Sequence, residues 1–269
     1  MTTHPFDLAL ALNAQGDGRF LGATSPAYAN MVGPFGGVTA AQVLNAILQH
    51  PERLGDPVAL TVNYAAALSD GAFSIVARAA RTNRSTQHWV LEMVQGDHTV
   101  MTGTAVTAVR RETWGMAEVT MPTVKAPAEV PPQVRVVPVE WIKRYDVRLV
   151  GGPLPDGWDG RDSGSSLSQM WMRDAEPRPL DFCSLTALAD VFFPRVYVRR
   201  AQRVPIGTVS MTVYFHAGNL QFHATGTGFV LGQAQGQVFH NGFFDQSAQL
   251  WNEAGTLLAT SHQVVYFKE

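Results

Sequence analysis

Residues 181–194 form the segment that most constrains the fold. They are predicted to form a helix that is apolar on nearly every side, and such a helix must be buried. Asp181 can cap its start, because the carboxylate can accept from free N–H groups of the first turn. Pro194 ends it. Asp190 lies in the last turn, where the helix dipole disfavours a negative charge. A buried carboxylate in that place needs a partner or a chemical role.

The composition indicates a substantial core and no strong charge. The 269 residues carry a formal net charge of -2, and 46% are hydrophobic, which is enough for one large domain or two small ones. The near-neutral balance argues against a nucleic-acid partner. A single cysteine, Cys183, allows no internal disulfide and favours a reducing compartment. No signal peptide and no apolar run of membrane-spanning length is recognised, so we expect a cytoplasmic protein with no membrane partner.

The first half of the chain predicts one buried helix set among strands. Short strands are expected over residues 6–12 and 18–23. A turn marked by Gly36 and Gly37 then opens an apolar helix that ends before Pro51. Alternating side chains predict long antiparallel strands after this helix, over residues 58–68, 73–81, 88–95 and 99–110.

The second half repeats this order after a proline-rich stretch at residues 121–133, which predicts a linker. Strands are expected over 134–149 and 166–173, ahead of the helix at 181–194. Further strands are predicted after that helix, over residues 209–216, 221–231, 237–251 and 257–268.

Two units of this kind indicate an α+β fold. Each antiparallel sheet is expected to wrap its own buried helix, and the two sheets can pair edge to edge, which removes two exposed edges. The expected domains are residues 1–120 and 134–269, joined by the linker at 121–133.

Several short motifs, in their order along the chain, resemble the acyl-CoA thioesterase II family. They are Phe35-Gly36-Gly37 before the first helix, Trp171-Met172-Arg173 before the second, Leu188-Ala189-Asp190 at its end, Gly207-Thr208 at the start of a strand, and Gln263 in the last strand. The helix of that family commonly ends in Ser-Asp, whereas Ala189 precedes Asp190 here. The resemblance implies a double hotdog fold, an acyl-CoA substrate and a place in fatty acid metabolism. It also implies an active site made of Asp190, Thr208 and Gln263.

Thioester hydrolysis needs an activated water molecule and a place for the oxyanion. A carboxylate together with two neutral hydrogen-bonding side chains can hold and polarise one water. In this interpretation Asp190 is the base, and Thr208 and Gln263 orient the water. Backbone N–H groups of Gly36 and Gly37, at the start of the first helix, can stabilise the oxyanion if the two halves place them beside Asp190.

Each of these residues also has an ordinary structural interpretation. Asp190 can simply pair with a nearby arginine such as Arg195, and Thr208 can be a plain strand residue. Gln263 can point outward, because an inward glutamine is costly unless it is paired. The two glycines can serve only as a tight entry to the helix. On the residues alone, these alternatives stay open.

Four arginines follow the second helix and are candidates for binding the phosphates of coenzyme A. They are Arg195, Arg199, Arg200 and Arg203. A solvated loop is the alternative interpretation of this basic segment.

Two other functions are compatible with such a fold. A hotdog hydratase acting on enoyl-CoA needs an Asp/His pair, and no histidine directly follows Asp190. A non-catalytic protein that binds acyl-CoA would keep the cavity without turnover. No G-x-S-x-G motif is present, which argues against an α/β-hydrolase. The sequence indicates no cofactor and no metal, because its histidines lack metal-ligand spacing. Exposed sheet edges predict a homo-oligomer, most simply a dimer.

Overall fold

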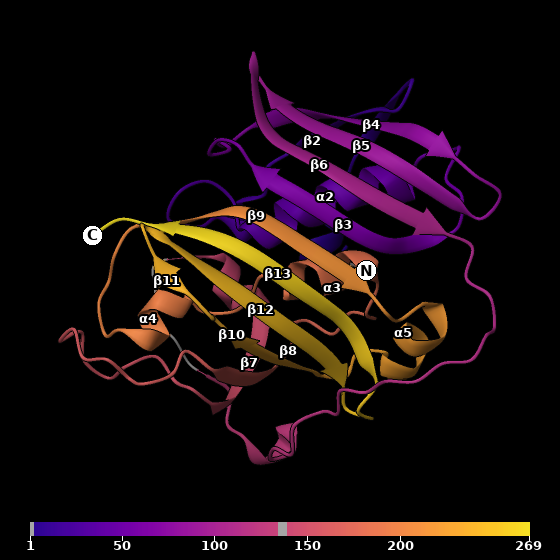
Figure 1. Cartoon of the computed structure of the whole chain (residues 1–269). Coiled ribbons are helices and arrows are strands. Elements are labelled where there is room, and N and C mark those ends of the chain that lie inside the picture. The colour runs from indigo at the N-terminus through magenta and orange to yellow at the C-terminus, as the bar shows by residue number, and fades with distance from the viewer. Residues whose placement is uncertain (1–2, 134–138) are drawn as a thin grey trace.

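The computed structural model describes residues 3–133 and 139–269 (Figure 1). Strands of both halves join into one sheet, with helices on its inner side. The elements of the first half are α1 (Pro5–Ala9), β1 (Asn13–Gly16), β2 (Arg19–Ala23), η1 (Pro26–Tyr28), α2 (Gly36–Leu48), β3 (Asp56–Tyr64), β4 (Ala72–Thr82), β5 (Thr86–Gln95) and β6 (His98–Ala108).

The second half begins beyond a long connection that contains the short helix η2 (Pro127–Glu129). Its elements are η3 (Trp141–Arg144), β7 (Tyr145–Gly151), β8 (Ser168–Asp174), α3 (Phe182–Leu188), α4 (Arg195–Arg199), β9 (Ile206–Phe215), α5 (Asn219–Thr225), β10 (Val230–Gln235), β11 (Phe239–His240), β12 (Phe243–Asn252) and β13 (Leu257–Phe267).

The two halves share a single antiparallel sheet. In the described residues it has 13 strands, in the order β1-β2-β4-β5-β6-β3-β9-β13-β12-β10-β8-β7, with β11 paired to β12. Strands β3 and β9 join the halves, and Thr61 faces Thr212 across this pair, with their hydroxyl oxygens 2.9 Å apart. The expected edge-to-edge pairing is therefore present, and it buries one strand edge from each half.

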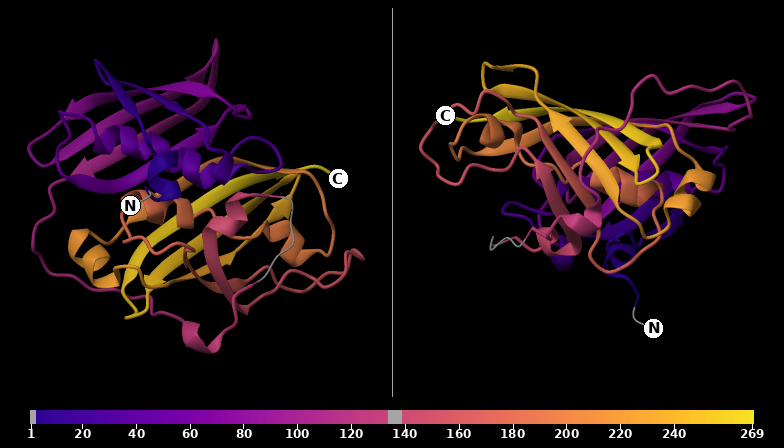
Figure 2. Two further views of the ribbon diagram at one scale, coloured as in Figure 1. Left: turned by 180° about the vertical axis from the view of Figure 1, so that it is seen from behind. Right: turned by 90° about the horizontal axis from the view of Figure 1, so that it is seen from below.

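Helices α2 and α3 pack against each other on the inner side of the sheet. In the view from behind, α2 lies across the strands of the first half (Figure 2). The helices run in opposite directions: Cys183 at the start of α3 lies against Ala41, and Ala187 near the end of α3 lies against Gly37 at the start of α2. This arrangement brings the beginning of one helix to the end of the other.

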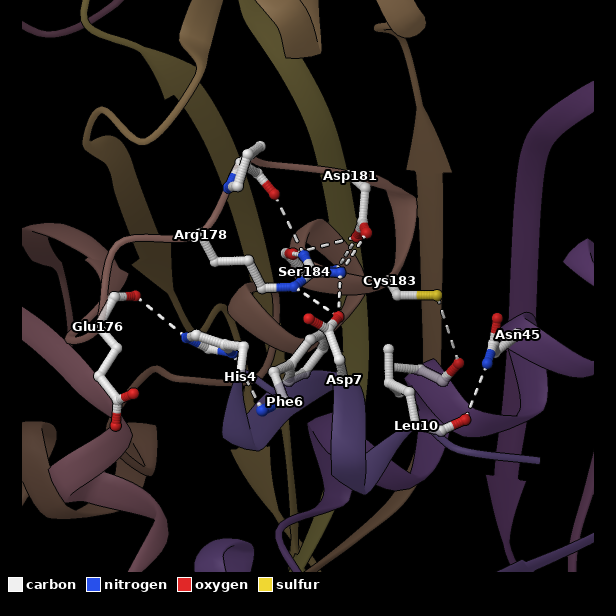
Figure 3. A network of polar contacts seen from close by, with 12 residues as sticks. His4, Phe6, Asp7, Leu10, Asn45, Glu176, Arg178, Asp181, Cys183 and Ser184 are labelled. Carbon is white, nitrogen blue, oxygen red and sulfur yellow. Dashed lines mark hydrogen bonds and ion pairs between the residues drawn. The ribbon is translucent and has the colours of Figure 1, made fainter. Parts of the chain in front are cut away.

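The start of α3 is fixed by the polar network in Figure 3. The Asp181 carboxylate accepts from the backbone N–H of Ser184 at 2.7 Å, which confirms the predicted cap. Arg178 bonds to that carboxylate at 2.6 Å and to Asp7 of α1 at 2.8 Å. The network therefore ties the N-terminal helix to α3 at the end away from Asp190.

Two segments predicted as strands begin as helices. Residues 6–12 were expected to be extended, but Pro5 occupies the first helical turn and His4 accepts from the backbone N–H of Phe6 at 3.1 Å. Both features favour a helix start. Residues 221–231 begin instead with α5, where the Gln221 side chain accepts from the N–H of Gly218 at 3.0 Å. Side-chain capping outweighed the strand propensity in both places.

Two further boundaries differ from the prediction. The strand expected over 134–149 is partly outside the described residues, and its described part consists of η3 followed by the beginning of β7. Helix α3 is regular only to Leu188, and the chain then turns before Pro194. In the described residues, no helix is long and apolar enough to cross a membrane.

Candidate active site

Asp190 lies in a turn two residues beyond the end of α3. Its own backbone N–H donates to the carbonyl of Ala187 at 3.1 Å. Its side chain receives two hydrogen bonds. Nε2 of Gln263 donates to Oδ1 at 2.9 Å, and the backbone N–H of Gly37 also donates to the carboxylate. No ion pair involves Asp190 in the described part of the chain. The alternative of a simple pair with Arg195 is therefore wrong.

Gln263 comes from β13, on the face of that strand that is turned to the core. The side chain is 5% exposed, so its amide needs partners. Besides Asp190, Nε2 lies 3.4 Å from the carbonyl of Ala189 and 3.5 Å from Sδ of Met211. The interpretation in which Gln263 points outward is thus excluded, and its buried amide is satisfied largely by the Asp190 turn.

The first half of the chain contributes the start of α2. A Cβ atom added to Gly36 would lie 2.9 Å from Oδ2 of Asp190, and one added to Gly37 would lie 2.7 Å from the carbonyl of Ala187. The absence of side chains at both positions allows the backbone to approach the Asp190 turn this closely. The glycine turn therefore lies beside Asp190, as expected.

The two glycine N–H groups are used differently. That of Gly37 is already bonded to the Asp190 carboxylate. That of Gly36, the first residue of α2, has no partner among the described residues, as is usual for the opening turn of a helix. Of the two predicted oxyanion donors, only Gly36 keeps a free N–H.

Burial raises the pKa of Asp190 from 3.8 to about 7, and the hydrogen bonds from Gln263 and Gly37 oppose that rise. Desolvation destabilises the carboxylate, whereas the two donors stabilise it. The carboxyl group therefore gains and loses its proton near neutral pH, which is the range in which a general base works best.

Thr208 lies on the strand next to Gln263. In the β9–β13 pair Met211 faces Gln263 and Thr208 faces Val265, with a register shift between the two pairs. Since paired residues point to the same side of a sheet, Thr208 shares the inner face with Gln263. Its side chain is half-buried and makes no hydrogen bond in the described part of the chain. The structure thus joins Asp190, Gln263 and Gly37 and places Thr208 nearby without a direct bond.

Tyr64, at the end of β3, is a site residue that the sequence did not single out. Its hydroxyl donates to the carbonyl of Gly36 at 2.9 Å. Burial, and secondly the charge of Asp190, raise the pKa of Tyr64 well above its usual value. In the sequence it looks like any aromatic residue at a strand end, and only the α2 turn beside it reveals its contact.

Aromatic rings pack against one another beside the start of α2. Phe35, just before Gly36, stacks on Trp141 of η3 with ring centres 4.2 Å apart. Tyr145 packs edge-on against both rings, at 6.1 Å from each. Because Phe35 comes from the first half and the other two from the second, this cluster holds the two halves together beside Asp190.

Arg195 does not have the predicted role. Its guanidinium is 0% exposed and donates to the carbonyls of Phe193, Ser166 and Ala234 and to the hydroxyl of Ser168. Burial lowers the pKa of this group. A fully enclosed side chain cannot reach a phosphate, so the prediction that Arg195 binds coenzyme A is wrong. Its carbonyl contacts instead fix the chain that follows Asp190.

The other three arginines lie at the surface with partners of their own. Arg199 pairs with Asp162, Arg200 with Glu269, and Arg203 lies over the ring of Trp158 at 4.5 Å. Arg200 also lines an open groove of about 580 Å³ beside the end of β13. A role for these three in phosphate binding stays a prediction.

Both halves of the chain match a family of known proteins. Residues 25–108 match the family model of the acyl-CoA thioesterase N-terminal domain, and residues 122–267 match that of the acyl-CoA thioesterase C-terminal domain. The chain therefore belongs to the acyl-CoA thioesterase family, as its motifs predicted.

Solved structures agree on the fold. A conserved protein of unknown function with a hot dog fold from Alicyclobacillus acidocaldarius is 48% identical, with a TM-score of 0.94 over 100% of this chain and 99% of that one. The tesB protein of Mycobacterium avium subs paratuberculosis is 17% identical, with a TM-score of 0.80 over 99% and 100% of the two chains. Acyl-CoA thioesterase II TesB2 from Mycobacterium marinum is 16% identical, with a TM-score of 0.75 over 98% of each chain. A search of curated proteins found no significant match. The chain has the hot dog fold.

Proposed function

We propose that the protein is an acyl-CoA thioesterase that hydrolyses acyl-CoA to a free acid and coenzyme A. The observation that carries this proposal is the position of the Asp190 carboxylate. It is held by Gln263 from the last strand and by the Gly37 N–H from the first helix. Two parts of the chain that are far apart in sequence therefore fix one basic oxygen near the start of a helix.

In the proposed reaction Asp190 removes a proton from a water molecule, whose oxygen attacks the thioester carbonyl carbon. The carbon–sulfur bond of the tetrahedral intermediate then breaks, and coenzyme A leaves as a thiolate that takes up the proton held by Asp190, which restores the carboxylate. Thr208 orients the water through its hydroxyl, and Gln263 holds the carboxylate. The free N–H of Gly36 stabilises the oxyanion, because it lies at the positive end of α2.

The finer architecture belongs to the same proposal. We propose that the chain is a double hotdog, with residues 1–120 and 134–269 as two hot dog units and residues 121–133 as their linker. Only the second unit supplies an acid, so each chain has one active site. We propose that the protein acts as a cytoplasmic homodimer in fatty acid metabolism.

Hydrolysis of a panel of acyl-CoA esters of short, medium and long chains tests the function. We expect the wild type to release free coenzyme A, and Asp190→Asn to lose at least about 100-fold in kcat, because the general base is removed. Thr208→Val should lose activity with little change in stability, and Thr208→Ser should retain most of it. Acyl-CoA binding without turnover in the wild type would favour a binding protein, and full activity of Asp190→Asn would refute the site.

A further inference from the structure

The peptide unit between Gly36 and Gly37 is hydrogen-bonded on both sides. Its carbonyl accepts from the hydroxyl of Tyr64 at 2.9 Å, and its N–H donates to the carboxylate of Asp190. The three groups therefore form a continuous series from the phenol through one peptide plane to the carboxylate. Tyr64 does not bond to Asp190, and any effect that it has on this residue must pass through the peptide.

Hydrogen bonds in series strengthen one another. When a hydroxyl donates to a peptide carbonyl, it draws electron density toward the oxygen and makes the N–H of the same peptide a better donor. A stronger donor favours the ionised form of the carboxyl group that accepts from it. The Tyr64 hydroxyl is thus arranged to stabilise the charged form of Asp190.

Strand β3 holds Tyr64 firmly in this position. Tyr64 faces Met101 in the β3–β6 pair, and the next residue, Ala65, donates to the carbonyl of Val100 at 3.0 Å. The hydroxyl and one ring carbon of Tyr64 each lie 3.4 Å from the place that a Cβ of Gly36 would occupy. The same place is 2.9 Å from Oδ2 of Asp190. Ring, peptide and carboxylate therefore meet at one point.

Few titratable groups face Asp190 in the described residues. Those that feel its charge are Tyr64 from β3 and Tyr145 from β7. Gln263 from β13 and Gly37 from α2 contribute neutral donors. Both tyrosines have a raised pKa, so they stay protonated near neutral pH. Tyr145 differs in that its hydroxyl has no hydrogen-bond partner among the residues that the structure describes.

We propose that Tyr64 is a positioning residue of the Asp190 site, acting through the Gly36–Gly37 peptide to orient the carboxylate and to stabilise its ionised form. The effect of Tyr64 on turnover rests on the proposed function, but the effect of Tyr64 on the Asp190 carboxyl group does not. Tyr64→Phe removes the hydroxyl and keeps the ring, which makes it the direct test.

The experiment follows the Asp190 carboxyl group by ¹³C NMR of aspartate-labelled protein across a pH titration, with Asp190→Asn to assign the signal. In Tyr64→Phe we expect the pKa of Asp190 to rise by about half a unit. Tyr145→Phe, which also removes a hydroxyl near Asp190 but one without a bond to the peptide, is the matched control and should leave the pKa of Asp190 unchanged. Fluorotyrosine at position 64 is a stronger donor and should shift the pKa of Asp190 downward, which provides a second test if Tyr64→Phe folds poorly.

The inference is overturned if both substitutions at position 64 leave the titration of Asp190 as in the wild type, or if Tyr145→Phe shifts it equally. Kinetics then separate the inference from the proposed function. For an active enzyme, the pH at which kcat/KM reaches half its plateau should rise in Tyr64→Phe together with the NMR titration. A wild type without thioesterase activity would refute the function, whereas the carboxyl titration alone decides the role of Tyr64.

Discussion

Nε2 of Gln263 donates to Oδ1 of Asp190 across 2.9 Å, and this contact joins the last strand of the sheet to the turn that follows α3. The two residues are 73 positions apart in the chain. Because Gln263 is 5% exposed and Asp190 carries no ion pair in the described residues, this neutral donor is one of two groups that stabilise the carboxylate. The site thus relies on hydrogen bonds rather than on a counter-ion.

Gln263→Leu should raise the pKa of Asp190 above about 7, since the donor that lowers it is removed and burial is left. The variant should therefore reach its full rate only at a higher pH than the wild type. Gln263→Glu adds a second carboxyl group and should raise the pKa of Asp190 further through like-charge repulsion. Profiles of kcat/KM against pH for the three proteins check both shifts, and coincident profiles would contradict the role assigned to Gln263.

The rate of the wild type should depend on pH through Asp190 itself. Only the ionised carboxylate can accept a proton from water, so kcat/KM should rise as the pH increases through about 7 and then level off. Below that range the carboxyl group is protonated and the rate should fall about tenfold per pH unit. The measurement is the rate of hydrolysis in buffers from about pH 5 to 9, an interval that includes the expected transition on both sides. A rate that stays constant between pH 5 and 7 would argue against Asp190 as the base.

Part of the Asp190 neighbourhood could be predicted from local patterns, whereas Gln263 was predicted only from the resemblance to the thioesterase family. The apolar run 181–194 predicted a buried helix, which is present over Phe182–Leu188, and the glycines at the start of α2 indicated a close approach. Gly36, Gly37 and Gln263 do lie beside Asp190. Their roles in the reaction, and that of Thr208, stay predictions.

Other features depend on contacts that no local pattern encodes. Arg195 looks like its surface neighbours Arg199 and Arg200 in the sequence, yet it is enclosed because carbonyls of three separate segments converge on it. Tyr64 acquires its contact from a helix turn 28 positions earlier in the chain. The strand predicted over 221–231 is wrong where α5 forms. There the Gln221 side chain accepts from the N–H of Gly218 and caps the helix, which outweighs the alternation of side chains.

Asp190→Asn should change stability in a pH-dependent way. Burial raises the pKa of Asp190 in the folded protein from 3.8 to about 7, so folding favours the protonated form. The stabilising contribution of this proton is fully present below pH 3.8 and is lost as the pH rises through about 7. The neutral amide avoids that loss and should stabilise the protein by about 1–3 kcal/mol at pH 8. Chemical denaturation at pH 5 and pH 8 checks the difference, which should be smaller at the lower pH.

Arg195→Met should destabilise the protein by about 3 kcal/mol or more, because three buried carbonyls and the Ser168 hydroxyl lose their donor. Arg200→Met is the matched control: this side chain is partly exposed and pairs with Glu269 at the surface, and such pairs contribute about 0–1 kcal/mol. Urea denaturation of both variants measures the contrast. Equal losses would show that the enclosure of Arg195 is not what stabilises the chain after Asp190.

Alanine at Gly36 and at Gly37 should separate the chemistry of the site from its packing. At Gly36 the new methyl group meets Oδ2 of Asp190 at 2.9 Å, so it should displace the carboxylate and lower kcat at least about tenfold with a small loss of stability. At Gly37 it meets the Phe35 ring at 2.6 Å and the Ala187 carbonyl at 2.7 Å. Helices α2 and α3 must then move apart, at a cost of about 1–3 kcal/mol. Gly157→Ala, where no atom lies within 4 Å, should change neither property. Melting temperatures and kcat for the three variants give the comparison, and a Gly36→Ala variant with wild-type kcat would mean that the α2 turn does not confine the reacting carboxylate.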